Sequence, residues 1–221
     1  MIKAVIFDMD GLMFDTERLG KILWNEYSEK FNQPIISEIH DMCMGTNVEY
    51  QRTIFEEKLG KEFDYDSFID YIWDLRVQTV KENGVPKKEG LDELIAFLRD
   101  NRIKIAVATS TAYNAAIENL KIAEVFDLFD AVVTGDMVKN SKPNPDIYLL
   151  ACSELGVNPE EAIGLEDSFN GVKAVYNAGM KCVMVPDLVE PDEEILKLCY
   201  KKADNLFEII ELIKEENKWS I

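Results

Sequence analysis

The chain has 221 residues, 47% of them hydrophobic, which is enough to bury a substantial core in one large domain or in a core domain with a smaller insert. Its 24 Lys and Arg against 42 Asp and Glu give a net charge of −18, which argues against nucleic acid and anionic membrane surfaces as partners. Met1 leads directly into a predicted strand and no apolar run is long enough to span a membrane, so we expect a cytoplasmic protein.

Five short runs of apolar, often β-branched residues predict the strands of a sheet. Each run is almost continuously apolar, as in strands that are covered on both faces of a parallel sheet. Helical patterns separate the later runs, and the alternation of strand and helix predicts a doubly wound, Rossmann-like α/β core. The predicted strands cover residues 3–7, 104–108, 131–134, 162–165 and 181–185.

Two acidic residues follow the first predicted strand. Alternate side chains of an extended chain share a face, so Asp8 and Asp10 are expected to point into the same space, and Gly11 lets the backbone turn away after them. Two crowded carboxylates repel each other unless a cation or a shared proton compensates their charge. This pair is therefore a candidate catalytic or metal site, although an acidic junction between strand and loop is also common.

No strand pattern occurs between residues 17 and 83, where apolar residues recur at helical spacing. We expect a small all-helical cap domain at 17–83, inserted after the first strand, and a core domain formed by 1–16 and 84–221. An insert at that position would hang over the carboxyl ends of the strands, where open α/β sheets bind ligands. The alternative is that these helices are outer layers of one domain. The single histidine, His40, is expected on the surface of a helix, and one histidine cannot support an ordinary zinc site.

Two further groups lie beyond later strands. Thr109, Ser110 and Thr111 form a hydroxyl cluster at the start of a helix, where backbone N–H groups and hydroxyls hold anions, although they could equally be an ordinary helix cap. Lys142 lies in the loop at 141–146, which contains two prolines. The prolines would stiffen its support and fix the position of its charge, whereas an ordinary loop lysine is only solvated.

Glu166 and Asp167 follow the fourth strand as a second acidic pair, with the alternative that Asp167 caps the next helix. Oxygen ligands without His or Cys select a hard cation, and Mg²⁺ bound by carboxylates and a substrate phosphate is the best match. Asp8, fixed at the strand end, is expected to ligate the metal and attack the phosphoryl group. Asp10, one step further into the loop, can protonate the leaving alcohol and later take a proton from water.

This constellation resembles the haloacid dehalogenase-type hydrolase superfamily, in its subgroup with a small helical cap. Residues 8–11, Asp-Met-Asp-Gly, match its first motif, Thr109 the second, Lys142 the third and the pair at 166–167 the fourth. The resemblance implies Mg²⁺-dependent phosphoryl transfer through an aspartyl-phosphate, with the backbone carbonyl of Asp10 on the metal and the first strand central in the sheet. The expected metal set is Asp8, Asp10, Glu166 and Asp167, and the expected phosphate-binding set is Met9, Asp10, Thr109, Ser110 and Lys142.

Within this superfamily the chain is similar to phosphatases of phosphorylated sugars and to β-phosphoglucomutase. The mutase uses a basic residue after a cap glycine, but residues 45–49 here read Gly-Thr-Asn-Val-Glu. We therefore expect a phosphatase of a small phosphorylated metabolite, with a sugar phosphate as the expected class and Gly45, Thr46 and Asn47 as specificity residues. A mutase-like isomerase and a non-catalytic binding module are the alternatives. The sequence predicts no oligomeric state.

Overall fold

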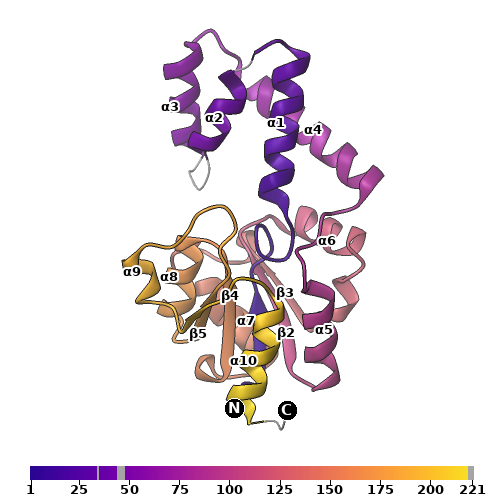
Figure 1. The fold of residues 1–221 in the computed structure, drawn as a ribbon, viewed down its shortest axis with the longest axis vertical. Coiled ribbons are helices and arrows are strands. Elements are labelled where there is room, and N and C mark those ends of the chain that lie inside the picture. The colour runs from indigo at the N-terminus through magenta and orange to yellow at the C-terminus, as the bar shows by residue number, and fades with distance from the viewer. Residues whose placement is uncertain (34, 44–47, 219–221) are drawn as a thin grey trace. The chain divides into compact units, whose positions relative to one another are not determined.

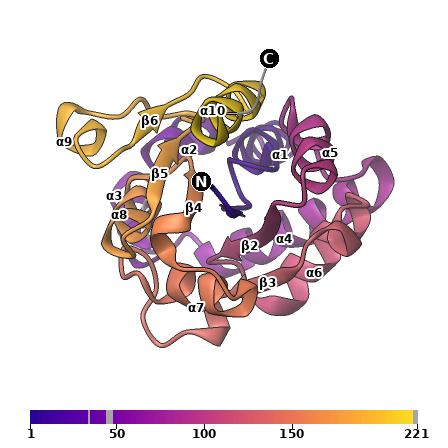
Figure 2. The same ribbon diagram turned by 90° about the horizontal axis from the view of Figure 1, so that it is seen from below.

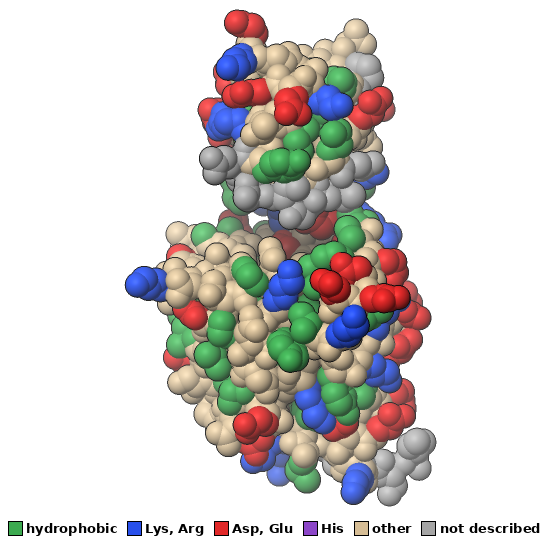
Figure 3. Space-filling model, turned by 90° about the vertical axis from the view of Figure 1, so that its left-hand side faces the viewer, with side chains coloured by type: hydrophobic (Ala, Val, Ile, Leu, Met, Phe, Trp, Pro, Cys, Tyr) green, Lys and Arg blue, Asp and Glu red, His purple; other side chains and the backbone are tan. Residues whose placement is uncertain are grey.

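The computed structural model describes residues 1–33, 35–43 and 48–218 (Figure 1). The chain forms two compact units, one of Met1–Asp15 with Pro86–Ile221 and one of Thr16–Val85. On the face drawn in Figure 3, Lys and Arg side chains lie interspersed with Asp and Glu. Among the helices of the described ranges, none combines the length and apolar character needed to cross a lipid bilayer.

The larger unit is built on a parallel sheet of six strands in the described residues, ordered β3-β2-β1-β4-β5-β6, which confirms the doubly wound α/β prediction with the first strand at the centre. The five predicted strands are present, and their ends differ from the prediction by at most one residue. The sixth, β6, is only two residues long and carries no apolar run that could have predicted it. The strands are β1 (Ala4–Phe7), β2 (Lys104–Thr109), β3 (Ala131–Thr134), β4 (Ala162–Glu166), β5 (Lys181–Met184) and β6 (Lys201–Lys202).

Helices cover both faces of this sheet (Figure 2). Ala4 and Ile6 of β1 join a buried cluster with residues of α7 and α8, so Val5 and Phe7 point to the opposite face, where α5 and α10 pack together. The helices of this unit are α5 (Leu91–Asp100), α6 (Tyr113–Ile122), α7 (Asp146–Leu155), α8 (Phe169–Asn177), α9 (Glu193–Leu196) and α10 (Phe207–Asn217), with short 3-10 turns η1 (Phe126–Leu128), η2 (Gly135–Met137) and η3 (Pro159–Glu161).

In its described residues the smaller unit consists of helices joined by turns and loops, with α1 (Thr16–Lys30), α2 (Ile35–Cys43), α3 (Val48–Leu59) and α4 (Tyr65–Asn83). Its core is rich in aromatic side chains. The ring of Trp24 lies edge-on at 4.9 Å from Phe68 and at 5.6 Å from Phe55, between ring centroids. Such contacts add to the stabilisation from burial alone, so the four helices are held around one cluster.

The prediction that His40 is a surface residue was wrong. His40 is only 6% exposed, and its ring lies 5.0 Å from that of Trp24 in an edge-on contact. It follows the buried Ile36 by four residues in α2 and precedes the buried Cys43 by three. Helical spacing thus places His40 on the apolar stripe, which faces the core of the small unit.

Candidate active site

The carboxyl edge of the sheet brings together residues that are far apart in the sequence. In the parallel register, Phe7 lies beside Val107 on one side and Leu165 on the other. Asp8 is the next residue after Phe7, and its backbone N–H donates to the carbonyl of Leu165 at 3.0 Å. The side chains that follow β1, β2 and β4 therefore meet at one edge, as the sequence predicted for parallel strands.

Lys142, from the loop between η2 and α7, lies among these strand ends. Its ammonium contacts Oδ1 of Asp8 and donates to Oε1 of Glu166 at 2.6 Å and to the carbonyl of Ala108 at 3.0 Å. The lysine side chain is 7% exposed, and the Glu166 side chain is fully buried. The structure thus joins the first, third and fourth predicted motifs through one buried cation.

Hydrogen bonds to both carboxylate oxygens hold the side chain of Glu166 in place. Oε1 accepts a bond from the hydroxyl of Tyr148 at 2.6 Å as well as from Lys142, and Oε2 accepts one from the hydroxyl of Ser168 at 3.1 Å. Gly171 leaves the space that the carboxyl group fills, since a Cβ at that position would lie within 2.0 Å of its atoms. Glu166 therefore has little freedom to move and orients the lysine.

Asp167 completes a group of three carboxylates with Asp8 and Glu166. One oxygen of each lies within 4.8 Å of the others. Gly11, at φ +86°, makes room for this group, because a Cβ there would lie 2.1 Å from Oδ2 of Asp167. The alternative that Asp167 caps the next helix is wrong, because Ser168 is the cap and its hydroxyl accepts a bond from the N–H of Gly171 at 3.1 Å.

The charges of this group do not balance without a cation or protons. Three ionised carboxylates and one ammonium leave two negative charges in a buried space. Burial raises the pKa of Asp8 to about 8, with Glu166 adding to the shift and Lys142 opposing it. Burial and the charges of Asp8 and Glu166 raise the pKa of Asp167 to about 9. Two bound protons or one divalent cation would restore neutrality, and an all-oxygen ligand set fits a hard cation.

The carboxylate of Asp10 takes a separate position near this group. Its Oδ2 accepts a bond from the hydroxyl of Thr111 at 2.7 Å, and the N–H of Thr111 donates to Oγ1 of the buried Thr109 at 3.1 Å. In the described part of the chain, the group of three carboxylates that could hold a metal ion does not include that of Asp10. The chain turns directly after β1, so the two-residue period of a strand no longer aligns Asp10 with Asp8. Asp10 is therefore still predicted to bind the metal through its backbone carbonyl, and not through its carboxylate.

The other predicted phosphate-binding residues lie in the same loops. Met9 is fully buried, and its carbonyl accepts bonds from the N–H groups of Met13 and Phe14, which closes the turn after β1. Ser110 is exposed directly after β2, next to Thr109. The predicted specificity residues Gly45, Thr46 and Asn47 lie outside the described residues.

Two supporting side chains were missing from the predicted site. Tyr148 and Ser168 donate to Glu166, and neither was among the predicted site residues. Thr111, which donates to Asp10, was predicted only as part of the hydroxyl cluster after the second strand. A tyrosine on the apolar face of the helix directly after Lys142 was a possible signal, because a buried phenol needs a hydrogen-bond partner. In the structure Tyr148 is fully buried, and its ring centroid lies 5.2 Å from Nζ of Lys142.

Comparisons with known proteins agree with these motifs. The sequence model of the family described as haloacid dehalogenase-like hydrolase matches residues 5–185. The phosphorylated carbohydrates phosphatase of Thermotoga maritima is 35% identical over 180 residues, which cover 81% of this chain and 83% of that protein. A crystal structure of CbbY from Rhodobacter sphaeroides in complex with phosphate is similar with a TM-score of 0.72 and 28% identity, over 95% of this chain and 96% of that one.

A crystal structure of β-phosphoglucomutase from Clostridium difficile is also similar, with a TM-score of 0.72 and 27% identity over 99% of each chain. The family match covers far more than half of the chain and includes all four motifs. The chain therefore belongs to the haloacid dehalogenase-like hydrolases, which confirms the prediction from the motifs.

Replacing Tyr148 tests whether the buried carboxylate depends on its phenol. In Tyr148→Phe, Glu166 loses one donor without losing the packed ring, so we expect the free energy of unfolding to fall by about 2 kcal/mol. Urea denaturation measures this change. Tyr176→Phe is the matched control, since Tyr176 is 52% exposed on α8 and its loss of a hydroxyl should leave stability unchanged. Equal stability of the two variants would show that the bond to Glu166 contributes nothing.

The stability of the metal-free protein should fall as the pH rises from the pKa of an unfolded aspartate to the raised pKa values of Asp8 and Asp167. The pKa values of Asp8 and Asp167 are raised to about 8 and about 9, whereas an unfolded aspartate titrates near about 3.9. Between these values the native state binds more protons than the unfolded state, so stability is lost as the pH rises. The melting temperature in EDTA should therefore decrease from about pH 6 to about pH 9.

Two variants isolate the contribution of the acidic group to this pH profile. Asp167→Asn removes one of the two carboxyl groups with a raised pKa and should flatten the profile of melting temperature against pH. Asp100→Asn, at an exposed position of α5, should give the same profile as the native protein. Parallel profiles for the native protein and Asp167→Asn would contradict the assigned shifts.

Proposed function

We propose that the protein is a Mg²⁺-dependent phosphatase that hydrolyses a small phosphorylated metabolite, with a sugar phosphate as the expected class. The observation that supports it most is the buried contact of Lys142 with Asp8 and Glu166 at the carboxyl edge of the sheet, beside a third carboxylate. Such a site offers a nucleophile, a fixed positive charge and metal ligands to one phosphoryl group. Similarity to the phosphorylated carbohydrates phosphatase supports the substrate class.

The metal would be held by Asp8 and Asp167, with Glu166 and the backbone carbonyl of Asp10 as further candidate ligands. Its contribution is positive charge that offsets the charge of the phosphoryl oxygens and of the carboxylates themselves. The donor set favours Mg²⁺ over softer metals, because it contains only oxygen atoms.

Lys142 is the residue that would orient the phosphoryl group. An ammonium has three N–H donors, and Glu166 and the carbonyl of Ala108 accept two of them. The third, which contacts Asp8, can turn to a phosphoryl oxygen without releasing the other two. Burial by itself lowers the pKa of Lys142, but the two carboxylates outweigh that effect and raise it, so the side chain stays charged at neutral pH.

The proposed reaction has two steps. A carboxylate oxygen of Asp8 attacks phosphorus, the bond from phosphorus to the leaving alcohol breaks, and Asp10 gives its proton to the alcohol oxygen. Asp10 then takes a proton from a water molecule that attacks the aspartyl-phosphate, which releases phosphate and restores the carboxylate of Asp8. The hydroxyl of Thr111 holds the carboxyl group of Asp10, and Thr109 and Ser110 would donate to the phosphoryl oxygens.

The helical unit is proposed to act as a cap. It is inserted between β1 and β2: the chain leaves the core after Asp15, shortly after Asp8 and Asp10 in the sequence, and returns to it at Pro86. A cap that closes over the substrate would exclude water from the first step and determine which alcohol fits. Gly45, Thr46 and Asn47 are the residues proposed to contact the substrate.

Similarity to β-phosphoglucomutase supports a second candidate, an isomerase that passes the phosphoryl group from Asp8 to a sugar hydroxyl instead of to water. The segment 45–49 argues against it, because it contains no basic residue to hold a second phosphate. A non-catalytic binding module is less well supported, because every side chain that the reaction needs is present.

A phosphate-release assay on a panel of phosphorylated sugars and other small metabolites tests this function. We expect release with Mg²⁺, loss in EDTA, and a decrease of about 10³-fold or more in kcat for Asp8→Asn. Asp100→Asn, the exposed control, should keep the native rate. Release that persists in Asp8→Asn would contradict the proposed nucleophile. Conversion of glucose 1-phosphate to glucose 6-phosphate without free phosphate would instead establish the isomerase.

A further inference from the structure

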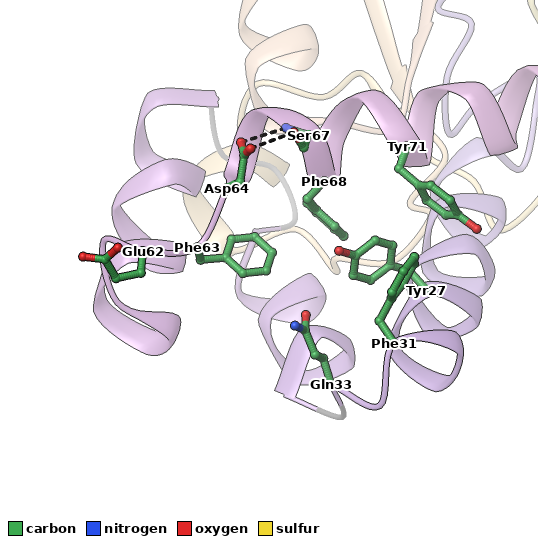
Figure 4. A pocket seen from close by; sticks show the side chains of 9 residues that line it. All are labelled: Tyr27, Phe31, Gln33, Glu62, Phe63, Asp64, Ser67, Phe68 and Tyr71. Atoms are coloured by element: carbon green, nitrogen blue, oxygen red, sulfur yellow. Dashed lines mark hydrogen bonds between the residues drawn. The ribbon is translucent and has the colours of Figure 1, made fainter.

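The helical unit contains a pocket of about 410 Å³ that the phosphoryl chemistry does not use (Figure 4). Its volume lies within the range of small-molecule sites. Five aromatic rings form much of its lining, and they come from α1, the turn after α1, the loop before α4 and α4 itself. These residues are Tyr27, Phe31, Phe63, Phe68 and Tyr71.

The ring faces at the rim of this pocket already attract an ammonium group of the chain itself. Nζ of Lys30 lies 5.6 Å from the ring centroid of Phe31 and 5.1 Å from that of Tyr71. It also donates to the hydroxyl of Tyr71 at 2.9 Å. Both distances lie within the range of cation–π attraction, so these rings suit an organic cation.

The charged side chains that line the pocket are acidic. Glu62 and Asp64 belong to the lining, and the lining residues include no Lys or Arg among those that the structure describes. Asp64 caps α4, where its oxygens accept bonds from the N–H of Ser67 at 3.1 Å and from its hydroxyl at 2.7 Å. These bonds lower the pKa of Asp64 and keep it ionised at neutral pH. The two carboxylates of the lining favour a cation, and the ammonium of Lys30 at the rim offsets part of their charge.

Gln33 provides the most specific feature of the pocket. Its amide oxygen is buried and has no hydrogen-bond partner among the described residues. Figure 4 shows this oxygen directed toward the aromatic side chains and away from the ribbon. A buried acceptor without a donor costs free energy, and a ligand with an N–H or O–H group would remove that cost.

We propose that this pocket binds a small organic ammonium compound, quaternary or protonated, that also carries an N–H or O–H donor. The aromatic rings contact its apolar body, Glu62 and Asp64 attract its charge, and Gln33 accepts its hydrogen bond. The site is independent of the phosphatase function, because it uses residues of the helical unit alone.

The test compares two ligands of equal shape that differ in charge. Choline carries a trimethylammonium group and a hydroxyl, and 3,3-dimethylbutan-1-ol is its neutral carbon analogue. A two-dimensional NMR titration at low salt, which reads the ring resonances of Tyr27 and Tyr71, should show choline binding about tenfold more tightly than the alcohol. Equal affinities would reduce the pocket to an apolar depression, and an absence of shifts for both compounds would likewise overturn the proposal.

Variants identify the groups responsible. Glu62→Gln should lower the affinity for choline by about threefold and leave the affinity for the neutral alcohol unchanged. The control is Glu57→Gln, which changes an exposed carboxylate of α3 outside the pocket and should leave both affinities at the native value. Gln33→Leu should weaken both compounds about fivefold, because both donate through a hydroxyl. Native affinity for choline in Glu62→Gln and Gln33→Leu would overturn the assignment of this site.

Discussion

The ammonium of Lys142 lies between the carboxylates of Asp8 and Glu166, and the geometry of the whole site depends on this contact. Three carboxylates within a few ångströms of one another, two of them buried and that of Asp167 half-buried, would otherwise repel each other. Lys142 compensates one of these charges and also bonds the carbonyl of Ala108, so it ties the ends of β1, β2 and β4 together. Removal of one partner from such a buried pair leaves an uncompensated charge, which typically costs about 3–5 kcal/mol.

The two excess negative charges that remain explain why the site suits a reaction on a phosphoryl group. In the proposed reaction a divalent cation would restore neutrality in the free site, and the third donor of Lys142 would turn from Asp8 to a phosphoryl oxygen as the substrate binds. Glu166 makes this possible because Lys142, Tyr148 and Ser168 fix both of its oxygens. The proposed nucleophile, Asp8, would thereby be free to react while the positive charge beside it stays in place, and such preorganisation lowers the barrier of phosphoryl transfer.

Much of the fold and of the site could be predicted, because both depend on patterns along the chain. Continuous apolar runs marked the five longer strands. Asp8 and Glu166 directly follow predicted strands and Lys142 lies in a loop beyond another, so the sequence predicted that they would meet. The two-residue strand β6 has no such pattern. His40 shows a different limit, because a polar residue at a core position of a helix is read as exposed unless its partner, Trp24, is known. The bonds of Tyr148 and Thr111 depend on tertiary contacts that no spacing in the sequence encodes.

In the proposed reaction Asp8 becomes covalently phosphorylated. Hydroxylamine attacks the carbonyl carbon of an aspartyl-phosphate, displaces phosphate and leaves a stable hydroxamate on the side chain. Peptide mass spectrometry of the protein during turnover of a phosphorylated sugar with Mg²⁺ and hydroxylamine should find this hydroxamate on Asp8, and only when substrate and metal are both present. A hydroxamate on another carboxyl group would contradict the assignment of Asp8 as the nucleophile. Steady phosphate release with Asp8 unmodified at every hydroxylamine concentration would contradict a covalent intermediate on Asp8.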